Sequence, residues 1–421
     1  MKHTNPSKRI YLDHASTTTI ALEVLDEMLP FFDASYGNPS SLYTSGRKAR
    51  KALEEARGSI AKILHASKEE IIFTSSGTES DNLAILGVAR AYKKYGNHII
   101  ISSIEHKAIL EAVKQLEKEG FVIEYFPVDK YGMIDVSDCV SRITAKTILI
   151  SVMYANNEIG TIQPIRELAQ AIAEMKKKRA ESSRSEFSAT SNHQPVTSDY
   201  PLLHTDACQA AGALSLDVTE LGVDLMSING SKIYGPKGVG VLFKKKGIIL
   251  SPIIFGGGQE YTLRSGTDNL PNIVGMSLAL SRIEKKKEEE SLRLIKLRDY
   301  CISELEKHIP DIVLNGHRTL RLPNNIHISI PCVEGESMVL MLDSLGSEVS
   351  TGSACSSNDL QVSHVLVATG QDPSLMHGSL RITLGETTSK DDCDYFLSTI
   401  SDIIKRLRSM SALTTSYEQK K

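Results

Sequence analysis

An acid and a lysine stand at the ends of two apolar runs in the middle of the chain. The run 202–205 ends on Asp206, and the run 225–229 leads into a glycine-rich loop that presents Lys232. In an open α/β sheet, ligands bind beyond the carboxyl ends of the strands, so the two side chains would meet there. Pyridoxal phosphate requires such a pair, an amine for a Schiff base and a carboxylate for the pyridinium nitrogen. The loop alone is more simply a hairpin-like turn with surface lysines, and the preceding acid favours the cofactor.

A phosphate-binding turn should lie near such a cofactor, and residues 74–80 (Thr-Ser-Ser-Gly-Thr-Glu-Ser) could supply it. They follow an apolar run and open a helix, where free amides and hydroxyls bind an anion well. An ordinary Ser/Thr helix cap is the simpler alternative. His106 follows the run 97–103 at another strand end. It is either a surface histidine or a group that stacks on the cofactor ring and moves protons, because its charge changes near physiological pH.

Taken together, these segments and several others resemble one family. The motifs are residues 76–82 (SGTESDN), 105–107 (EHK), 156–160 (NNEIG), 206–209 (DACQ), 232–238 (KIYGPKG), 264–267 (RSGT) and 353–355 (SAC), with 11–15 (YLDHA) and 37–41 (GNPSS). The chain thereby resembles the group I cysteine desulfurases of the NifS/IscS type, which are class V aminotransferase-like enzymes of PLP fold type I. The resemblance runs from about residue 10 to the last predicted helix and leaves out residues 179–200 and the tail.

The resemblance implies a role for each matching residue. Lys232 would hold pyridoxal 5'-phosphate and then shuttle the substrate Cα proton, Asp206 would pair with the pyridine nitrogen, and His106 would stack on the ring. Arg381 would clamp the substrate α-carboxylate with its planar guanidinium, assisted by Asn38. The other implied cofactor contacts are Gln209 and Asn156 at the ring oxygen, Gly77, Thr78, Asn229 and Ser231 at the phosphate, and Thr267 at the phosphate of the neighbouring subunit in a homodimer.

Cys355 differs in its surroundings from the other cysteines. It lies in a small, polar stretch, residues 350–359, which predicts an exposed mobile loop, and residues 356–361 resemble the longer loop of group I enzymes. As a thiolate it could attack the sulfur of L-cysteine and carry it as a persulfide to an acceptor protein, an iron–sulfur scaffold or a tRNA-thiolation relay. The remaining cysteines are predicted to be packing residues: Cys139, Cys208, Cys301, Cys332 and Cys393.

The predicted function is therefore that of a cysteine desulfurase, which converts L-cysteine to L-alanine. One position departs from the family pattern: the usual Ser-x-His before the lysine is replaced by Asn229 and Ser231. Two alternatives stay open. Selenocysteine lyases share this architecture, and an inactive homologue could serve as a scaffold for sulfur-transfer partners.

The elements that must position these residues follow from hydrophobic patterning. Short β-branched runs alternate with amphipathic helical stretches up to about residue 243, which predicts a doubly wound mixed sheet of the seven-stranded type. The runs are nearly continuous in hydrophobicity, as in strands covered on both faces. Predicted strands are 71–74, 99–101, 148–152, 202–205, 225–229 and 239–243, and predicted helices are 79–95, 108–119 and 165–178.

After about residue 265 the pattern indicates a smaller α+β domain. It comprises a long helical region, 272–308, broken near 285–290, strands at 326–330 and 380–384, and a last helix at 390–409. We expect an N-terminal segment (1–20) that packs with this small domain, a large cofactor domain (21–264), the small domain (265–413) carrying Cys355 and Arg381, and a disordered tail (414–421). Residues 179–200 are rich in Ser, Thr, Asn and Gln and predict a mobile surface insertion, or alternatively a phosphorylated or partner-binding loop.

Composition excludes several classes of protein. The chain has 421 residues, with 48 Lys and Arg against 51 Asp and Glu, so no basic field indicates a nucleic-acid partner. Six cysteines without a CxxC pair support neither a disulfide scaffold nor a zinc site. The polar N-terminus and the lack of a long apolar run predict neither a signal peptide nor a membrane span. We therefore expect a cytoplasmic enzyme without a metal.

Overall fold

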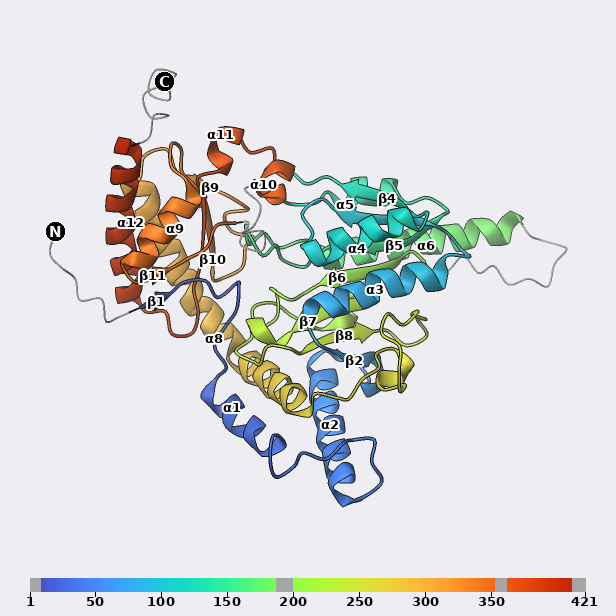
Figure 1. Cartoon of the computed structure of the whole chain (residues 1–421). Helices are drawn as coiled ribbons and strands as arrows, with labels where there is room; N and C mark the ends of the chain where they lie inside the picture. The colour runs from blue at the N-terminus through green and yellow to red at the C-terminus, as the bar shows by residue number, and fades with distance from the viewer. Residues whose placement is uncertain (1–8, 187–199, 353–361, 411–421) are drawn as a thin grey trace.

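The large sheet explains how residues far apart in sequence reach one edge. The computed structural model describes residues 9–186, 200–352 and 362–410. Its largest sheet has seven strands in the order β2-β8-β7-β6-β5-β3-β4 (Figure 1). The strands in that order are Ile71–Thr74, Gly240–Lys244, Leu225–Asn229, Leu202–Asp206, Thr147–Ser151, His98–Ser102 and Val122–Phe126. The α/β fold with a mixed seven-stranded sheet is confirmed.

Strand direction fixes where the loops emerge. The strand β8 is antiparallel to both of its neighbours, whereas the pairs β7–β6, β6–β5, β5–β3 and β3–β4 are parallel. Six strands of the sheet therefore end at the same edge, opposite to the end of β8. The segments that follow β2, β3, β5, β6 and β7 carry most of the predicted cofactor residues.

Both faces of the sheet are covered by helices. Phe73, Ile100 and Ile150 pack in a cluster with α2 (Thr44–Ile63), α6 (Ile165–Glu186) and α8 (Leu270–His308). The neighbouring strand residues Ile72, Ile99, Ile101 and Leu149 pack on the other face with α3 (Gly77–Tyr92) and α4 (Lys107–Lys118). Successive strand side chains point to opposite faces, so burial of both sets explains the nearly continuous apolar runs.

Helix α8 links the sheet to the small C-terminal sheet (Figure 1). Its first half joins the core cluster of α2, and its second half packs with α12 (Lys390–Met410). The three-stranded antiparallel sheet has the order β12-β10-β9, formed by Ser379–Thr383, Asn325–Ser329 and Val313–Leu314. The remaining helices are α1 (Leu22–Met28), α5 (Val136–Ser141), α7 (Val218–Leu221), α9 (Gly335–Ser344), α10 (His364–Ala368) and α11 (Pro373–Met376).

Two expectations about helices are wrong. The predicted break of α8 near 285–290 is absent, because its 39 residues contain neither Gly nor Pro beyond the first two turns and Lys287–Glu284 and Arg293–Glu290 pairs bridge that region. Helix α6 extends to Glu186, so the predicted insertion from residue 179 begins as helix. Residues 187–199 and the tail 411–421 lie outside the described residues.

The N-terminal segment crosses from the small sheet to the large one. Its strand β1 (Ile10–Tyr11) pairs in parallel with β11 (Ser347–Glu348), and Asp13 forms a bridge with Thr383. Across the described ranges, none of the helices is both long and apolar enough to cross a membrane. In the same ranges no cluster of three potential metal ligands is found.

Candidate active site

Four predicted cofactor residues follow strands that end at one sheet edge. Asp206 is the last residue of β6, and Lys232 closes a short 3₁₀ turn directly after β7. Gly77 begins α3 three residues after the end of β2, and His106 is the N-cap of α4 after β3. The parallel order of these strands gathers segments that are separated by more than a hundred residues in sequence.

Lys232 is held by the N-terminal segment. Its Nζ donates a hydrogen bond to the carbonyl oxygen of Ser16. The carbonyl oxygen of Ser231 accepts from the amide of Thr18 at 2.8 Å and from its hydroxyl at 3.1 Å. The Thr18 hydroxyl also accepts from the amide of Tyr234 at 2.8 Å. The lysine loop is therefore fixed by a segment more than two hundred residues earlier.

Asp206 lies beside buried groups that carry little charge. Its Oδ1 accepts from the amide of Cys208 at 2.9 Å, and the residue is buried. Burial, and secondly the charge of Asp206, raises the pKa of Asp81 well above its ordinary value. Burial also raises the pKa of Glu105 to about 8 and lowers that of His204 to about 3. Burial thus favours the uncharged form of all three groups next to Asp206.

The first residue of α3 has no room for a side chain, so it must be glycine. Ser76 caps the helix by accepting from the amide of Glu79 at 3.2 Å. A Cβ at Gly77 would lie 2.6 Å from the sulfur of Cys208 and 3.1 Å from Nδ2 of Asn229. Nδ2 of Asn229 is a hydrogen-bond donor, and with the first-turn amides of α3 it would suit a phosphate. The phosphate contacts of Gly77 and Asn229 stay predictions.

His106, Asn156 and Gln209 also lie at this edge, each with a contact to backbone. Nδ1 of His106 accepts from the amide of Ala108 at 3.2 Å, and Nε2 of Gln209 donates to the carbonyl of Ala15 at 2.9 Å. The amide of Asn156 is occupied at both ends: Oδ1 accepts from the amides of Glu158 and Ile159, and Nδ2 donates to the carbonyl of Ile104. Asn156 therefore holds its own loop, and its contact with the cofactor stays a prediction.

Arg381 and Lys232 both donate a hydrogen bond to Ser16. It is a buried residue of β12, and its Nη2 donates to Oδ1 of Asp13 at 2.9 Å and to the hydroxyl of Ser16 at 2.8 Å. Its Nη1 donates to the carbonyl of Asn157 at 3.0 Å, whereas its Nε is buried without a partner. Ser16 thus joins the lysine through its carbonyl and the arginine through its hydroxyl. The unpartnered Nε gives the guanidinium a donor for a further anion.

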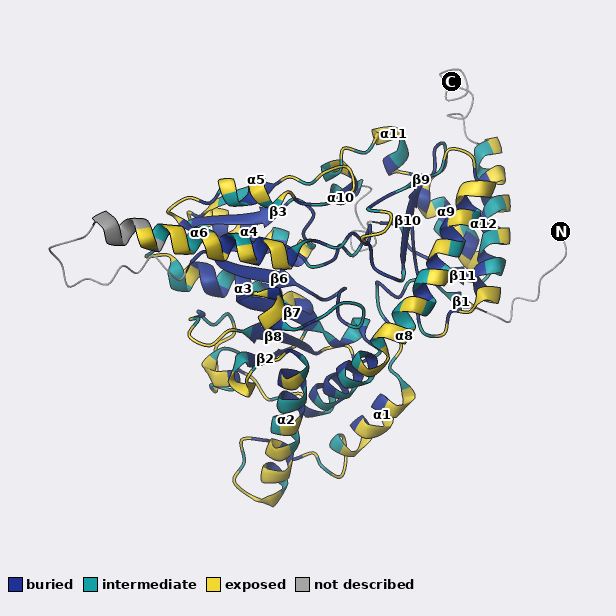
Figure 2. Ribbon diagram, turned by 180° about the vertical axis from the view of Figure 1, so that it is seen from behind, coloured by how far each residue is buried: buried dark blue, intermediate teal, exposed yellow. Residues whose placement is uncertain are grey.

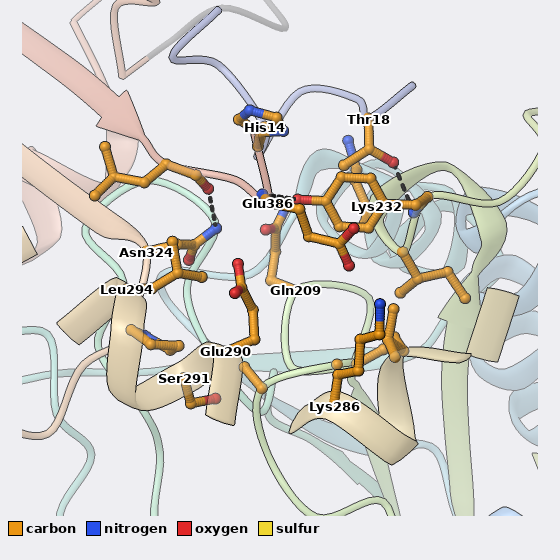
Figure 3. Close-up of a pocket in the computed structure, with 18 residues that line it drawn as sticks. His14, Thr18, Gln209, Lys232, Lys286, Glu290, Ser291, Leu294, Asn324 and Glu386 are labelled. Carbon is orange, nitrogen blue, oxygen red and sulfur yellow. Dashed lines mark hydrogen bonds between the residues drawn. The ribbon is translucent and has the colours of Figure 1, made fainter. Parts of the chain in front are cut away.

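Sequence reasoning missed Asp13, Ser16 and His14, although Asp13 and His14 lie in the YLDHA motif. His14 is buried, both ring nitrogens lack hydrogen-bond partners, and burial lowers its pKa to about 4. It faces a cavity of about 70 Å³ that Lys232 and Gln209 also line, opposite Glu290 of α8 (Figure 3). A motif with no assigned role was the signal that could have marked this segment.

The other predicted site residues are exposed or half-buried, or lie outside the described residues. Asn38 and Thr267 are exposed, and Oδ1 of Asn38 accepts from the amide of Ser40 at 2.9 Å. Thr78 is exposed in the first turn of α3, and Ser231 is half-buried beside Lys232. Cys355 lies outside the described residues. Of the other cysteines, Cys139, Cys208, Cys301 and Cys393 are buried, and Cys332 is half-buried.

Comparison with known proteins identifies the family to which the chain belongs. Residues 10–179 and 196–396 match the family described as aminotransferase class-V. The chain belongs to the aminotransferase class-V family. It is 48% identical to the cysteine desulfurase IscS of Dictyoglomus turgidum, over 96% of each chain. It is 44% identical to the cysteine desulfurase IscS of Clostridium botulinum, over 99% of each chain. A solved NifS-like protein superposes with a TM-score of 0.84 at 34% identity, covering 94% of this chain and 99% of the other.

These similarities confirm the predicted activity and cofactor. This class-V aminotransferase is a cysteine desulfurase that depends on pyridoxal phosphate. The residues present fit that group: an amine at Lys232, a buried carboxylate at Asp206, and the first-turn amides of α3 with the Nδ2 donor of Asn229 beside them. Such an activity requires L-cysteine as substrate and an acceptor for its sulfur.

Proposed function

We propose that this desulfurase binds L-cysteine between Lys232 and Arg381 and transfers its sulfur to Cys355. The observation that carries the proposal is Ser16, whose carbonyl accepts from Lys232 and whose hydroxyl accepts from Arg381. A small amino acid bound here would have its α-carboxylate at the guanidinium and its Cα within reach of the amine. The unpartnered Nε of Arg381 supports the carboxylate contact.

Each residue of the site would then have a defined task. Bound pyridoxal phosphate would supply an electron sink for the substrate Cα. Asp206 would hold the pyridine nitrogen, and the α3 N-terminus with Asn229 would hold the phosphate. Lys232 would secure the cofactor and take the Cα proton. His106 would stack on the ring and move protons, and Gln209 would contact the ring oxygen.

The sulfur step balances without an external oxidant. The Cys355 thiolate attacks the substrate sulfur, a new S–S bond forms, and the bond between that sulfur and Cβ breaks with its electron pair staying on carbon. Protonation of this carbon gives the methyl group of L-alanine. The products are one L-alanine and one Cys355 persulfide, which passes its outer sulfur to an acceptor such as an iron–sulfur scaffold or a tRNA-thiolation relay.

Replacement of Cys355 tests the assignment. The Cys355→Ala variant should keep the absorbance of the bound cofactor and should exchange the Cα proton of L-alanine in D₂O, because that exchange needs Lys232 and not the thiol. It should form no persulfide and release no sulfide from L-cysteine. The Cys332→Ala variant, which removes a half-buried cysteine, should retain all of these activities. Unchanged L-cysteine turnover in Cys355→Ala would exclude Cys355 as the carrier.

We also propose that the chain works as a homodimer. Large apolar side chains are exposed on α1 and on the loop from α1 to α2, among them Leu42 at 89%, and Phe255 is 82% exposed. Figure 2 shows exposed residues along α1 and this loop. Exposed apolar side chains of this size are typical of subunit interfaces. A second subunit here would support the predicted contact of Thr267 with the partner's phosphate.

Light scattering tests the dimer. Leu42→Asp and Phe255→Asp should shift the protein to a monomer and weaken cofactor retention, because Thr267 would lose the partner's site. Leu292→Asp, at an exposed leucine of α8, is the matched control and should remain dimeric. A wild-type mass equal to one chain would contradict the proposal.

A further inference from the structure

A single buried carboxylate binds the residue on one side of 353–361 and lies close to the residue on the other side. Oε2 of Glu158 accepts from the hydroxyl of Ser363 at 2.5 Å. A Cβ built at Gly352 would lie 3.0 Å from the same Oε2. Gly352 and Ser363 are the described residues that bracket the segment on its two sides, Gly352 immediately and Ser363 one residue further on. Glu158 itself is 5% exposed.

The backbone of Glu158 is fixed independently of those flanks. Its amide donates to Oδ1 of Asn156 at 2.9 Å, and its carbonyl accepts from Nδ2 of Asn325 at 2.9 Å. Asn156 lies on the loop after β5, and Asn325 begins β10 of the small sheet. The carboxylate therefore extends from a point that is held from both sheets.

The Gly352 flank packs closely against a second buried group. The same Cβ position at Gly352 would lie 2.6 Å from Nε2 of His327, so a side chain there has no room. His327 is fully buried, and its Nε2 lacks a hydrogen-bond partner. In the small sheet His327 is opposite Arg381, and Arg381 exchanges two backbone hydrogen bonds with Ser350 at 2.7 and 3.2 Å. The segment that leads to Gly352 is thus paired, through Ser350, with Arg381, the predicted substrate-binding residue.

The Ser363 flank is tied to the same point by a side chain. Ser363 caps α10 by accepting from the amides of Val365 and Leu366, while its hydroxyl hydrogen is directed to Glu158. Burial raises the pKa of Glu158 to about 7, and the Ser363 hydrogen bond and the charge of Arg381 oppose that rise. A carboxylate kept buried in this way needs its hydrogen bond, since an unpaired buried oxygen is costly.

We propose that Glu158 is a positioning residue that holds Gly352 and Ser363, the described residues that bracket 353–361, close to Arg381, and so supports the sulfur step assigned to Cys355. This inference rests on the proposed role of Cys355 as the sulfur carrier. Glu158 acts through the flanks and touches neither substrate nor cofactor in this account. Its loss should therefore slow sulfur attack and spare the chemistry at Cα.

Two rates separate these effects. The rate of Cα-proton exchange of L-alanine in D₂O measures the chemistry at Cα, which needs Lys232, Arg381 and the cofactor. The rate of persulfide formation on Cys355 measures the sulfur step. Glu158→Ala should lower the persulfide rate at least about tenfold while exchange stays within about twofold, since small misplacements of a reacting group are costly. Glu158→Gln keeps an acceptor for Ser363 and should retain most of the persulfide rate.

The test also needs a control variant and a measurement that does not depend on enzyme activity. Asp392→Ala removes another buried carboxylate that accepts from a serine, Ser389, but lies at the start of α12. It should leave the ratio of the two rates unchanged. In hydrogen exchange without cofactor, Glu158→Ala should speed exchange of amides in residues 350–352 and in α10 by about tenfold.

The outcomes are distinct. Equal losses of both rates in Glu158→Ala, a persulfide rate equal to wild type, or unchanged amide exchange at the flanks would each overturn the role of Glu158. Failure of the proposed function itself would look different, because the wild-type protein would then exchange L-alanine without ever forming a persulfide on Cys355.

Discussion

The two sides of the site are built in different ways. On the cofactor side, Asp206, Lys232 and the α3 N-terminus follow directly from ends of paired strands, so the ladder of the large sheet places them. On the substrate side, Arg381 lies in a small sheet and reaches the site through side-chain contacts with Asp13 and Ser16. The first side is positioned by backbone pairing and the second by polar side chains. Substitutions should therefore affect the two sides through different kinetic parameters.

The largest effect is expected on the cofactor side. Lys232→Ala removes the group that takes the Cα proton, so L-alanine formation should fall by at least about 10³-fold. Alkylation of Cys355 by iodoacetamide should stay near the wild-type rate, because the substitution is on the other side. Assays of alanine and labelled Cys355 give both values. Substantial turnover in Lys232→Ala would contradict the role of this lysine.

A smaller effect is expected on the substrate side. Arg381→Lys keeps the charge but loses the guanidinium that joins Asp13, Ser16 and Asn157, so KM for L-cysteine should rise about 10- to 100-fold with less change in kcat. Steady-state kinetics measures the split. Arg318→Lys, in the exposed pair with Glu306, is the control and should leave KM unchanged. A loss confined to kcat would show that Arg381 does not bind the carboxylate.

A single methyl group at Gly77 should disturb the predicted phosphate site at the N-terminus of α3. Gly77→Ala places a Cβ against the sulfur of Cys208 and the amide of Asn229, so cofactor affinity should weaken about tenfold. Titration of the apoprotein with pyridoxal phosphate measures it. Adding Cys208→Ala removes one clash and should recover part of the affinity. Unaltered affinity in Gly77→Ala would argue against a phosphate at this helix.

The last effect concerns stability and pH and does not involve catalysis. Folded Glu105 keeps its proton up to about pH 8 because burial raises its pKa, whereas the unfolded residue loses it near its ordinary value of 4.5. Raising the pH from 5 to 8 therefore favours unfolding, by about 1.4 kcal/mol per pH unit for one proton. Glu105→Gln should reduce this slope in urea unfolding by its own share, and the exposed Glu111→Gln should not. An unchanged slope in Glu105→Gln would show that the carboxyl is ionised in the folded protein.

Sequence patterning predicted the cofactor side well because its residues follow recognisable strands. Asp206 and Lys232 were placed at one edge from the apolar runs before them. Ser16 and Glu158 could not be found in this way, since their contacts join segments hundreds of residues apart and depend on side-chain direction. The continuity of α8 was also missed, because its charged middle resembles a break unless the i,i+3 pairs are considered.

Peptide mass spectrometry of the reacted protein tests the central claim most directly. The holoenzyme is mixed with equimolar L-cysteine, quenched by alkylation and digested, and each of the six cysteine peptides is examined. The account predicts one added sulfur atom on the Cys355 peptide and one L-alanine for each persulfide formed. Added sulfur on a different cysteine, or L-alanine formed without any protein persulfide, would contradict it.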